Sequence, residues 1–156
     1  MFKTIALGTA GFVMAASAAF ADSHIDPAIA GALKARQSHM ELYQFNAGML
    51  FAMASDKMPY DAEAASAAAS NLVTLTKLDQ SGYWPQGSDS EAVEGTRALP
   101  AMWENYPDVI AKATAFNEAV VAMDAVAGTD LASVKGAIGP IGAACTACHK
   151  AYRQPK

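Results

Sequence analysis

The chain of 156 residues contains two cysteines, Cys145 and Cys148, which stand three positions apart near the C-terminus and directly before His149. A disulfide between cysteines this close would close a very short loop and would restrict the unfolded chain little. The fold therefore has to be held by the packing of its own apolar side chains. If the segment is helical, Cys145, Cys148 and His149 lie on one side of that helix.

Helical periodicity covers most of the chain, and no segment alternates in the way a half-buried strand does. Asp61 is a suitable N-cap for a second helix, and Pro107 either kinks the third helix or marks its first turn. We expect Gly139-Pro140 to bend the last helix before Cys145. Turn-forming residues fill the segment from 80 to 100. The predicted helices are 27–55, 62–77, 102–126 and 131–152, and they predict an all-α fold, an antiparallel up-down-up-down four-helix bundle.

In the first predicted helix, residues that are three and four positions apart fall on one face. The residues assigned to that face are Leu33, Arg36 with Gln37, Met40, Gln44, Ala47 and Phe51. His39 lies about 100° around the helix from Met40. We therefore expect His39 at the surface or at an interface.

The first 21 residues have the layout of a secretory signal peptide. Lys3 precedes an apolar run, and Ala19-Phe20-Ala21 provides an A-x-A cleavage pattern. This predicts a signal peptide over 1–21, one mature domain over 22–156 and export to a bacterial periplasm. No later segment is expected to cross or insert into a membrane. The chain is acidic, with a formal net charge of −4, which argues against nucleic acid as a partner.

The Cys-x-x-Cys-His pattern allows four interpretations. A disulfide would constrain little, and a thioredoxin-like pair should begin a helix that follows a strand. A structural zinc site needs four ligands, and only His24 and His39 remain to complete it. The fourth is the c-type haem attachment pattern, in which two thioethers hold the porphyrin and the adjacent imidazole coordinates iron. The sequence favours haem, and a soft-metal site built from Met and Cys is a remaining alternative.

A haem motif on the last helix resembles the class II cytochromes c, which comprise cytochrome c prime and its low-spin, methionine-ligated relatives. The likeness covers nearly all of 22–156. Its specific parts are Gly139-Pro140-Ile141-Gly142 leading into Cys145-Thr146-Ala147-Cys148-His149, then Tyr152-Arg153, Arg36-Gln37-Ser38 and Met58-Pro59-Tyr60-Asp61.

The resemblance implies that His149 is the proximal iron ligand and that Met40 occupies the distal position. Arg36 and Gln37 would meet the haem propionates, and Arg153 would flank the proximal side. If Met40 binds iron, the protein is an electron carrier rather than an enzyme, with periplasmic or membrane redox partners. If the distal site is vacant, it binds nitric oxide or carbon monoxide instead. The family also implies pairing through the first two helices, so a homodimer is expected.

Overall fold

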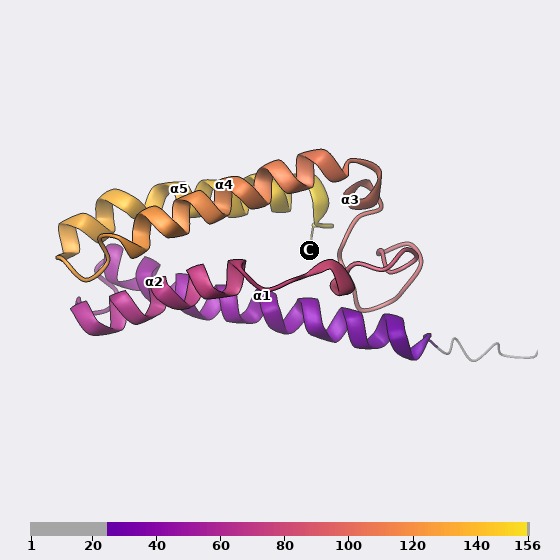
Figure 1. Ribbon diagram of the computed structural model, residues 1–156, viewed down its shortest axis with the longest axis horizontal. Coiled ribbons are helices and arrows are strands. Elements are labelled where there is room, and N and C mark those ends of the chain that lie inside the picture. Colours follow the sequence, from indigo (N-terminus) through magenta and orange to yellow (C-terminus); the bar gives the residue numbers. More distant parts are fainter. Residues whose placement is uncertain (1–24, 156) are drawn as a thin grey trace, which may run out of the picture.

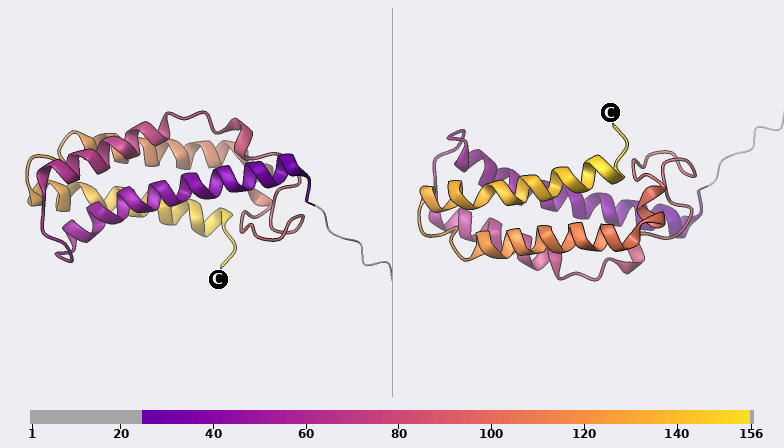
Figure 2. Two further views of the ribbon diagram at one scale, coloured as in Figure 1. Left: turned by 90° about the horizontal axis from the view of Figure 1, so that it is seen from below. Right: turned by 90° about the horizontal axis from the view of Figure 1, so that it is seen from above.

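The computed structural model describes residues 25–155, and these form a bundle of four long helices. The helices are α1 (Pro27–Ala54), α2 (Ala62–Thr76), α4 (Tyr106–Asp124) and α5 (Leu131–Tyr152), with the short helices η1 (Ser81–Tyr83) and α3 (Ala101–Glu104) between α2 and α4. The long helices contact one another in a ring, α1 on α2, α2 on α4, α4 on α5 and α5 on α1 (Figures 1 and 2). The predicted all-α up-down-up-down bundle is confirmed.

Aspartate side chains start three of the four long helices. Asp26, Asp61 and Asp130 each accept a hydrogen bond from a backbone N–H in the first turn, at 2.7 to 2.8 Å. Each therefore satisfies a donor that the helix leaves without a partner, and a negative charge is favourable at that end. The predicted cap at Asp61 is confirmed.

The third predicted helix is divided in two. α3 ends at Glu104, Asn105 interrupts the helix, and α4 begins at Tyr106 with Pro107 in its first turn. Pro107 thus begins a helix instead of kinking one, in agreement with the missing N–H of proline. In α5, by contrast, Pro140 lies inside a helix that continues through it.

The apolar core occupies one half of the bundle. The helix pairs α1/α2 and α4/α5 lie close together at the end that holds the α1–α2 and α4–α5 connections, and they diverge towards the end that holds the long 77–100 segment (Figure 1). The largest fully buried apolar side chains lie towards the close end: Leu50, Met53, Leu72, Val120, Met123, Val134 and Ile141. Towards the divergent end the interior of α1 is lined by polar and aromatic side chains.

The face of α1 that was assigned from residue spacing is buried only in part. Gln37, Met40, Gln44 and Phe51 are exposed. The buried residues of α1 are Ala32, Leu33, Arg36, His39, Asn46, Ala47, Leu50 and Met53. His39 is 3% exposed, so its predicted surface position is also wrong. Three polar residues of α1, Arg36, His39 and Asn46, are buried, and hydropathy does not predict burial for them.

Within the described part of the chain, α5 is long and apolar enough to cross a membrane, judged by length and composition. The expectation that no segment after residue 21 meets this criterion is therefore wrong. In the fold α5 packs along α4 and α1. The predicted signal peptide lies outside the described residues.

Candidate functional site

The Cys-x-x-Cys-His motif lies in the last two turns of α5. Cys145, Cys148 and His149 are each partly buried, and neither cysteine is in a disulfide. Burial raises the pKa of both thiols, so they are protonated near neutral pH. Burial also lowers the pKa of His149, and the positive charges of Arg153 and Arg97 lower it further. His149 is therefore a neutral imidazole, the form that can coordinate a metal.

Helix α1 faces this side of α5. The ring of Phe51 lies 3.2 Å from the position that a Cβ would take at Gly142, so the two antiparallel helices approach closely there. Met40 precedes Phe51 by eleven residues and His149 follows Gly142 by seven. Around its own helix axis, Met40 lies about 20° from Phe51 and His149 lies about 20° from Gly142. Measured along the axes, Met40 is about 16 Å and His149 about 10 Å from the contact, towards the same divergent end.

Met40 is the methionine of α1 that lies on this side. Its side chain is 39% exposed, whereas Met53 is 1% exposed and belongs to the core. Met49 packs against the core as well. Met58 follows the end of α1. Among the methionines of α1, Met40 therefore combines an exposed side chain with a helical position near the side that faces α5.

Arg36 is buried, with an exposed fraction of 3%, and it binds the segment that follows η1. Its Nη1 donates to Ser88 Oγ at 2.9 Å and to the Tyr83 carbonyl at 3.4 Å, and its Nη2 donates to the Ser88 carbonyl at 2.5 Å and to Thr96 Oγ1 at 2.7 Å. Burial lowers the pKa of Arg36, and the charge of Asp89 opposes that shift. All four terminal N–H groups are thus donated within the protein.

Gln37 lies on the exposed side of α1 beside the same segment. Its Nε2 donates to the carbonyl of Gly95 at 2.8 Å. Gly95 has a φ of +83°, a conformation that glycine adopts without a Cβ clash, and this turn presents the carbonyl to Gln37. The second N–H of the amide is available to another acceptor.

His39 packs in the interior between two tyrosine rings. Its ring centroid lies 4.5 Å from that of Tyr43 and 5.8 Å from that of Tyr83, in edge-to-face geometry. Among the described residues, its Nε2 is the one buried side-chain nitrogen or oxygen without a hydrogen-bond partner. Burial lowers the pKa of His39, so the ring is neutral. Nothing in its contacts identifies it as a ligand.

A polar network beside the motif was not predicted from the sequence. The hydroxyl of Tyr152 donates to Asp108 Oδ2 at 2.5 Å, and Lys112 Nζ donates to Asp108 Oδ1 at 3.1 Å. The Asp108 carboxylate raises the pKa of Tyr152 to about 12. The same hydrogen bonds from Tyr152 and Lys112 lower the pKa of Asp108. The end of α5 is thereby fixed to the first turns of α4, but a tyrosine and an aspartate 44 residues apart give no signal in the sequence.

The donor set fits a haem better than a bare metal ion. In the described part of the chain no three His, Cys, Asp or Glu side chains come together in a way that could hold a metal. The two thiols and the imidazole instead share one side of one helix, as attachment to a porphyrin edge requires. A planar, mostly apolar group would also fill out the divergent half of the bundle, where none of the largest fully buried apolar side chains lies.

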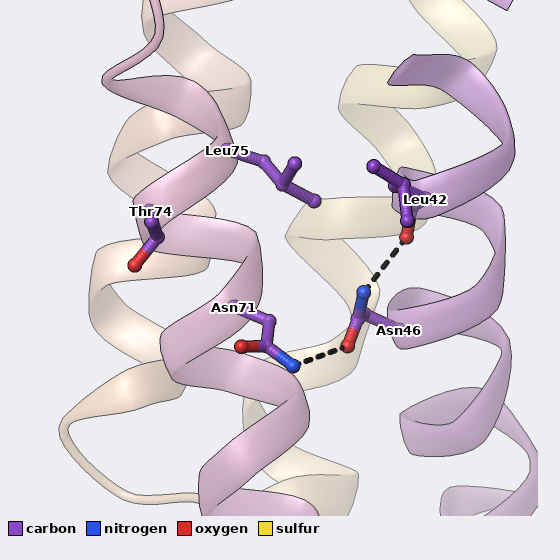
Figure 3. Close-up of a pocket in the computed structure, with 5 residues that line it drawn as sticks. All are labelled: Leu42, Asn46, Asn71, Thr74 and Leu75. Atoms are coloured by element: carbon purple, nitrogen blue, oxygen red, sulfur yellow. Dashed lines mark hydrogen bonds between the residues drawn. The ribbon is translucent and has the colours of Figure 1, made fainter. Parts of the chain in front are cut away.

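A pocket of about 260 Å³ between α1 and α2 is of a different kind. Its lining residues are Leu42, Asn46, Asn71, Thr74 and Leu75 (Figure 3). Asn71 Nδ2 donates to Asn46 Oδ1 at 3.0 Å, and Asn46 Nδ2 donates to the Leu42 carbonyl at 2.8 Å. No sulfur, imidazole or carboxylate lines it, so it is not the haem site.

The family model described as Cytochrome C' matches residues 31–153. The chain belongs to the cytochrome c′ family. It is 43% identical over 122 residues to cytochrome c-554 of Cereibacter sphaeroides, which covers 78% of this chain and 80% of that protein. The predicted membership among class II cytochromes is confirmed, and cytochromes of this family carry covalently bound haem c.

Solved structures of cytochromes c′ share the fold. The cytochrome c' from Rhodobacter Spheriodes superposes with a TM-score of 0.80 at 39% identity, covering 82% of this chain and 98% of that chain. A ferrous variant of cytochrome c prime from Alcaligenes xylosoxidans with bound nitric oxide superposes with a TM-score of 0.70 at 31% identity, covering 85% of this chain and 100% of that chain.

Proposed function

We propose that this cytochrome carries single electrons in the periplasm, through one haem c bound by Cys145, Cys148 and His149 and by Met40 as the second axial ligand. One observation carries the proposal. Counted along each helix from the Phe51–Gly142 contact, positions 40 and 149 fall close to the facing sides of α1 and α5, on the way to the end where the helices diverge, and this supports the assignment.

On α5 the chain's own residues have distinct tasks. The thiols of Cys145 and Cys148 form the two thioether bonds, and the intervening helical turn fixes how the porphyrin edge lies against α5. The imidazole of His149 stays neutral because burial and two nearby arginines disfavour its protonated form. Its lone pair is therefore available to iron near neutral pH.

On α1, Met40 supplies the ligand that sets the redox character. A bound haem c supplies the reversible one-electron change of its iron, and a histidine–methionine pair raises its reduction potential. The apolar side chain of Met40 is 39% exposed, and contact with a porphyrin face would cover it.

Polar contacts to the propionates come from the first turns of α1 in this proposal. Gln37 is exposed and has an amide N–H to donate. Contact between Arg36 and a propionate remains a prediction, and the propionate would have to compete with four acceptors that Arg36 already serves.

Export is part of the proposal, because covalent attachment of this type is made outside the bacterial cytoplasm. Residues 1–21 would act as the signal peptide and be removed, leaving 22–156 as the mature domain. Cytochromes of this family are periplasmic. The physiological partners would then be periplasmic or membrane redox proteins, and the family is not typically enzymatic.

Binding of a small gas is the second candidate function. A methionine thioether is a weak, displaceable ligand, and Met40 lies at an accessible position. The nitric oxide-bound Alcaligenes xylosoxidans protein shows that a relative of this fold holds such a gas. In this candidate Met40 packs over the distal side without coordination.

Pairing of two copies through α1 and α2 is the proposed assembly. Leu42 and Phe45 are 49% and 66% exposed and lie three residues apart on α1, so they share one side of that helix. Leu42 also lines the α1–α2 pocket. Sedimentation of the wild type and of Phe45→Lys tests this assembly, since a lysine at that position would favour the monomer.

The visible spectrum of the oxidised and reduced protein, with and without carbon monoxide, tests the function directly. An electron carrier with Met40 coordinated gives low-spin bands and a sulfur-to-iron charge-transfer band, and it binds carbon monoxide slowly. High-spin bands with rapid carbon monoxide binding would instead establish the gas-binding candidate.

A further inference from the structure

We propose that Arg36 is a positioning residue for the haem. Its side chain holds the 84–100 segment, and this segment fixes the part of α1 that carries Met40 relative to the part of α5 that carries His149. This inference rests on the proposed function, because it takes the haem to lie between those two parts of the bundle.

The first step is the way Arg36 is bound. Its four terminal N–H groups are donated to Ser88, Thr96 and the Tyr83 carbonyl, and none goes to a carboxylate. Its guanidinium carbon lies 4.8 Å from the ring centroid of Trp84 and 5.9 Å from that of Trp103. A planar group with several fixed donors matches this set of acceptors, whereas a lysine ammonium would leave acceptors without a donor.

The second step is the connection from this segment to α5. The Leu99 N–H donates to the Tyr152 carbonyl at 3.0 Å, and the Gln154 N–H donates to the Arg97 carbonyl at 2.8 Å. The Arg97 guanidinium also donates to the carbonyl of Gln154. These bonds reach the end of α5 within one turn or so of His149.

The third step is that the segment itself is internally bonded between these two attachments. Thr96 Oγ1, which accepts from Arg36, also accepts from the Ala98 N–H at 3.2 Å. The Ser90 N–H donates to the Ala98 carbonyl at 2.7 Å. A continuous set of hydrogen bonds therefore runs from Arg36, one turn before Met40, to the residues that follow His149.

This path spans the bundle where the helices diverge (Figure 1). Because the largest fully buried apolar side chains lie towards the other end, we take the bonded segment to help fix the separation of α1 and α5 here. Loss of the Arg36 bonds would allow α1 to move with respect to α5 while the thioether attachment on α5 remains.

The test compares haem-loaded Arg36→Lys with the wild type and with Lys34→Met, a matched change at an exposed cation of the same helix. We expect Arg36→Lys to keep its haem, to exchange the Ser90 and Leu99 amide hydrogens roughly tenfold faster, and to bind carbon monoxide roughly tenfold faster when ferrous. Lys34→Met should change none of these. Arg36→Met, which removes the charge as well, should show a larger effect if it folds.

Faster exchange in Arg36→Lys with unchanged carbon monoxide binding and an unchanged spectrum would overturn the proposal, because Arg36 would then be only structural. Unchanged exchange with a shifted reduction potential would also overturn it, in favour of a propionate contact. If the wild-type spectrum is high-spin, ligation by Met40 is wrong, but the exchange and carbon monoxide rates still decide the role of Arg36.

Discussion

The ring of Phe51 on α1 lies against Gly142 on α5, 3.2 Å from where a Cβ would be. From this contact the two helices continue towards Met40 on α1 and His149 on α5. A side chain at position 142 would push against the ring, and for this reason glycine occupies a helix interior where it otherwise lowers stability.

Two glycine-to-alanine variants of α5 separate helix propensity from this contact. Gly136 has open space around its Cβ position, so Gly136→Ala should raise the free energy of unfolding by about 1 kcal/mol. Gly142→Ala gains the same propensity but must displace the Phe51 ring, so we expect a smaller gain or a loss. Urea denaturation of both variants measures the difference, and equal gains would show that the contact is unimportant.

Replacement of Met40 should change the spin state of the iron. In Met40→Ala the haem stays attached through α5, and the oxidised protein should convert from a low-spin to a high-spin spectrum because the thioether is gone. Met58→Ala is a matched control, since Met58 is 40% exposed compared with 39% for Met40 and lies beyond the end of α1. A Met40→Ala spectrum identical to that of the wild type would exclude coordination by this residue.

The Tyr152–Asp108 hydrogen bond predicts a tyrosine that ionises late. The pKa of Tyr152 is raised from 10.0 to about 12, so the folded protein keeps a proton that the unfolded chain releases near pH 10. The bond therefore contributes its full stability below about pH 10, and that contribution is lost as the pH rises towards about 12. In Asp108→Asn the pKa of Tyr152 should return towards 10, which a titration of tyrosinate absorbance measures. Tyr152→Phe should remove the late ionisation from the titration altogether. If the late ionisation persisted in Tyr152→Phe, it would belong to another tyrosine.

The buried imidazole of His39 predicts a loss of stability in mild acid. Burial lowers its pKa below 6.5 in the folded state, so the unfolded chain binds the proton more readily. Stability is then lost as the pH falls through about 6.5, the pKa of an unfolded histidine. His39→Phe keeps the ring contacts with Tyr43 and Tyr83 without a titrating group, and its free energy of unfolding should decline less than that of the wild type on acidification. If the free energy of unfolding fell equally in the wild type and in His39→Phe on acidification, His39 would titrate as an exposed histidine does.

Much of the fold could be predicted because local signals marked the ends of the helices. Asp61 caps α2 at the predicted position, and α5 has its predicted bounds. The division at Asn105 could not be predicted, because Pro107 is compatible both with a kink and with a first turn.

The orientation of α1 was predicted less well, for a physical reason. Arg36 and His39 are buried because the 77–100 segment and two tyrosine rings surround them, and only the tertiary structure provides those partners. Hydropathy alone assigns such residues to the surface. The assignment of Cys145, Cys148 and His149 to a haem site depends on the spacing of the motif, which the sequence states fully, and their roles remain proposals to be tested.

The intact mass of the exported protein under denaturing conditions tests the central proposal most directly, because denaturation removes any cofactor that is not covalently bound. Thioether attachment at Cys145 and Cys148 predicts a coloured protein with the mass of residues 22–156 plus one haem. A colourless protein with the mass of its amino acids alone, purified from a host able to attach haem c, would contradict the proposal.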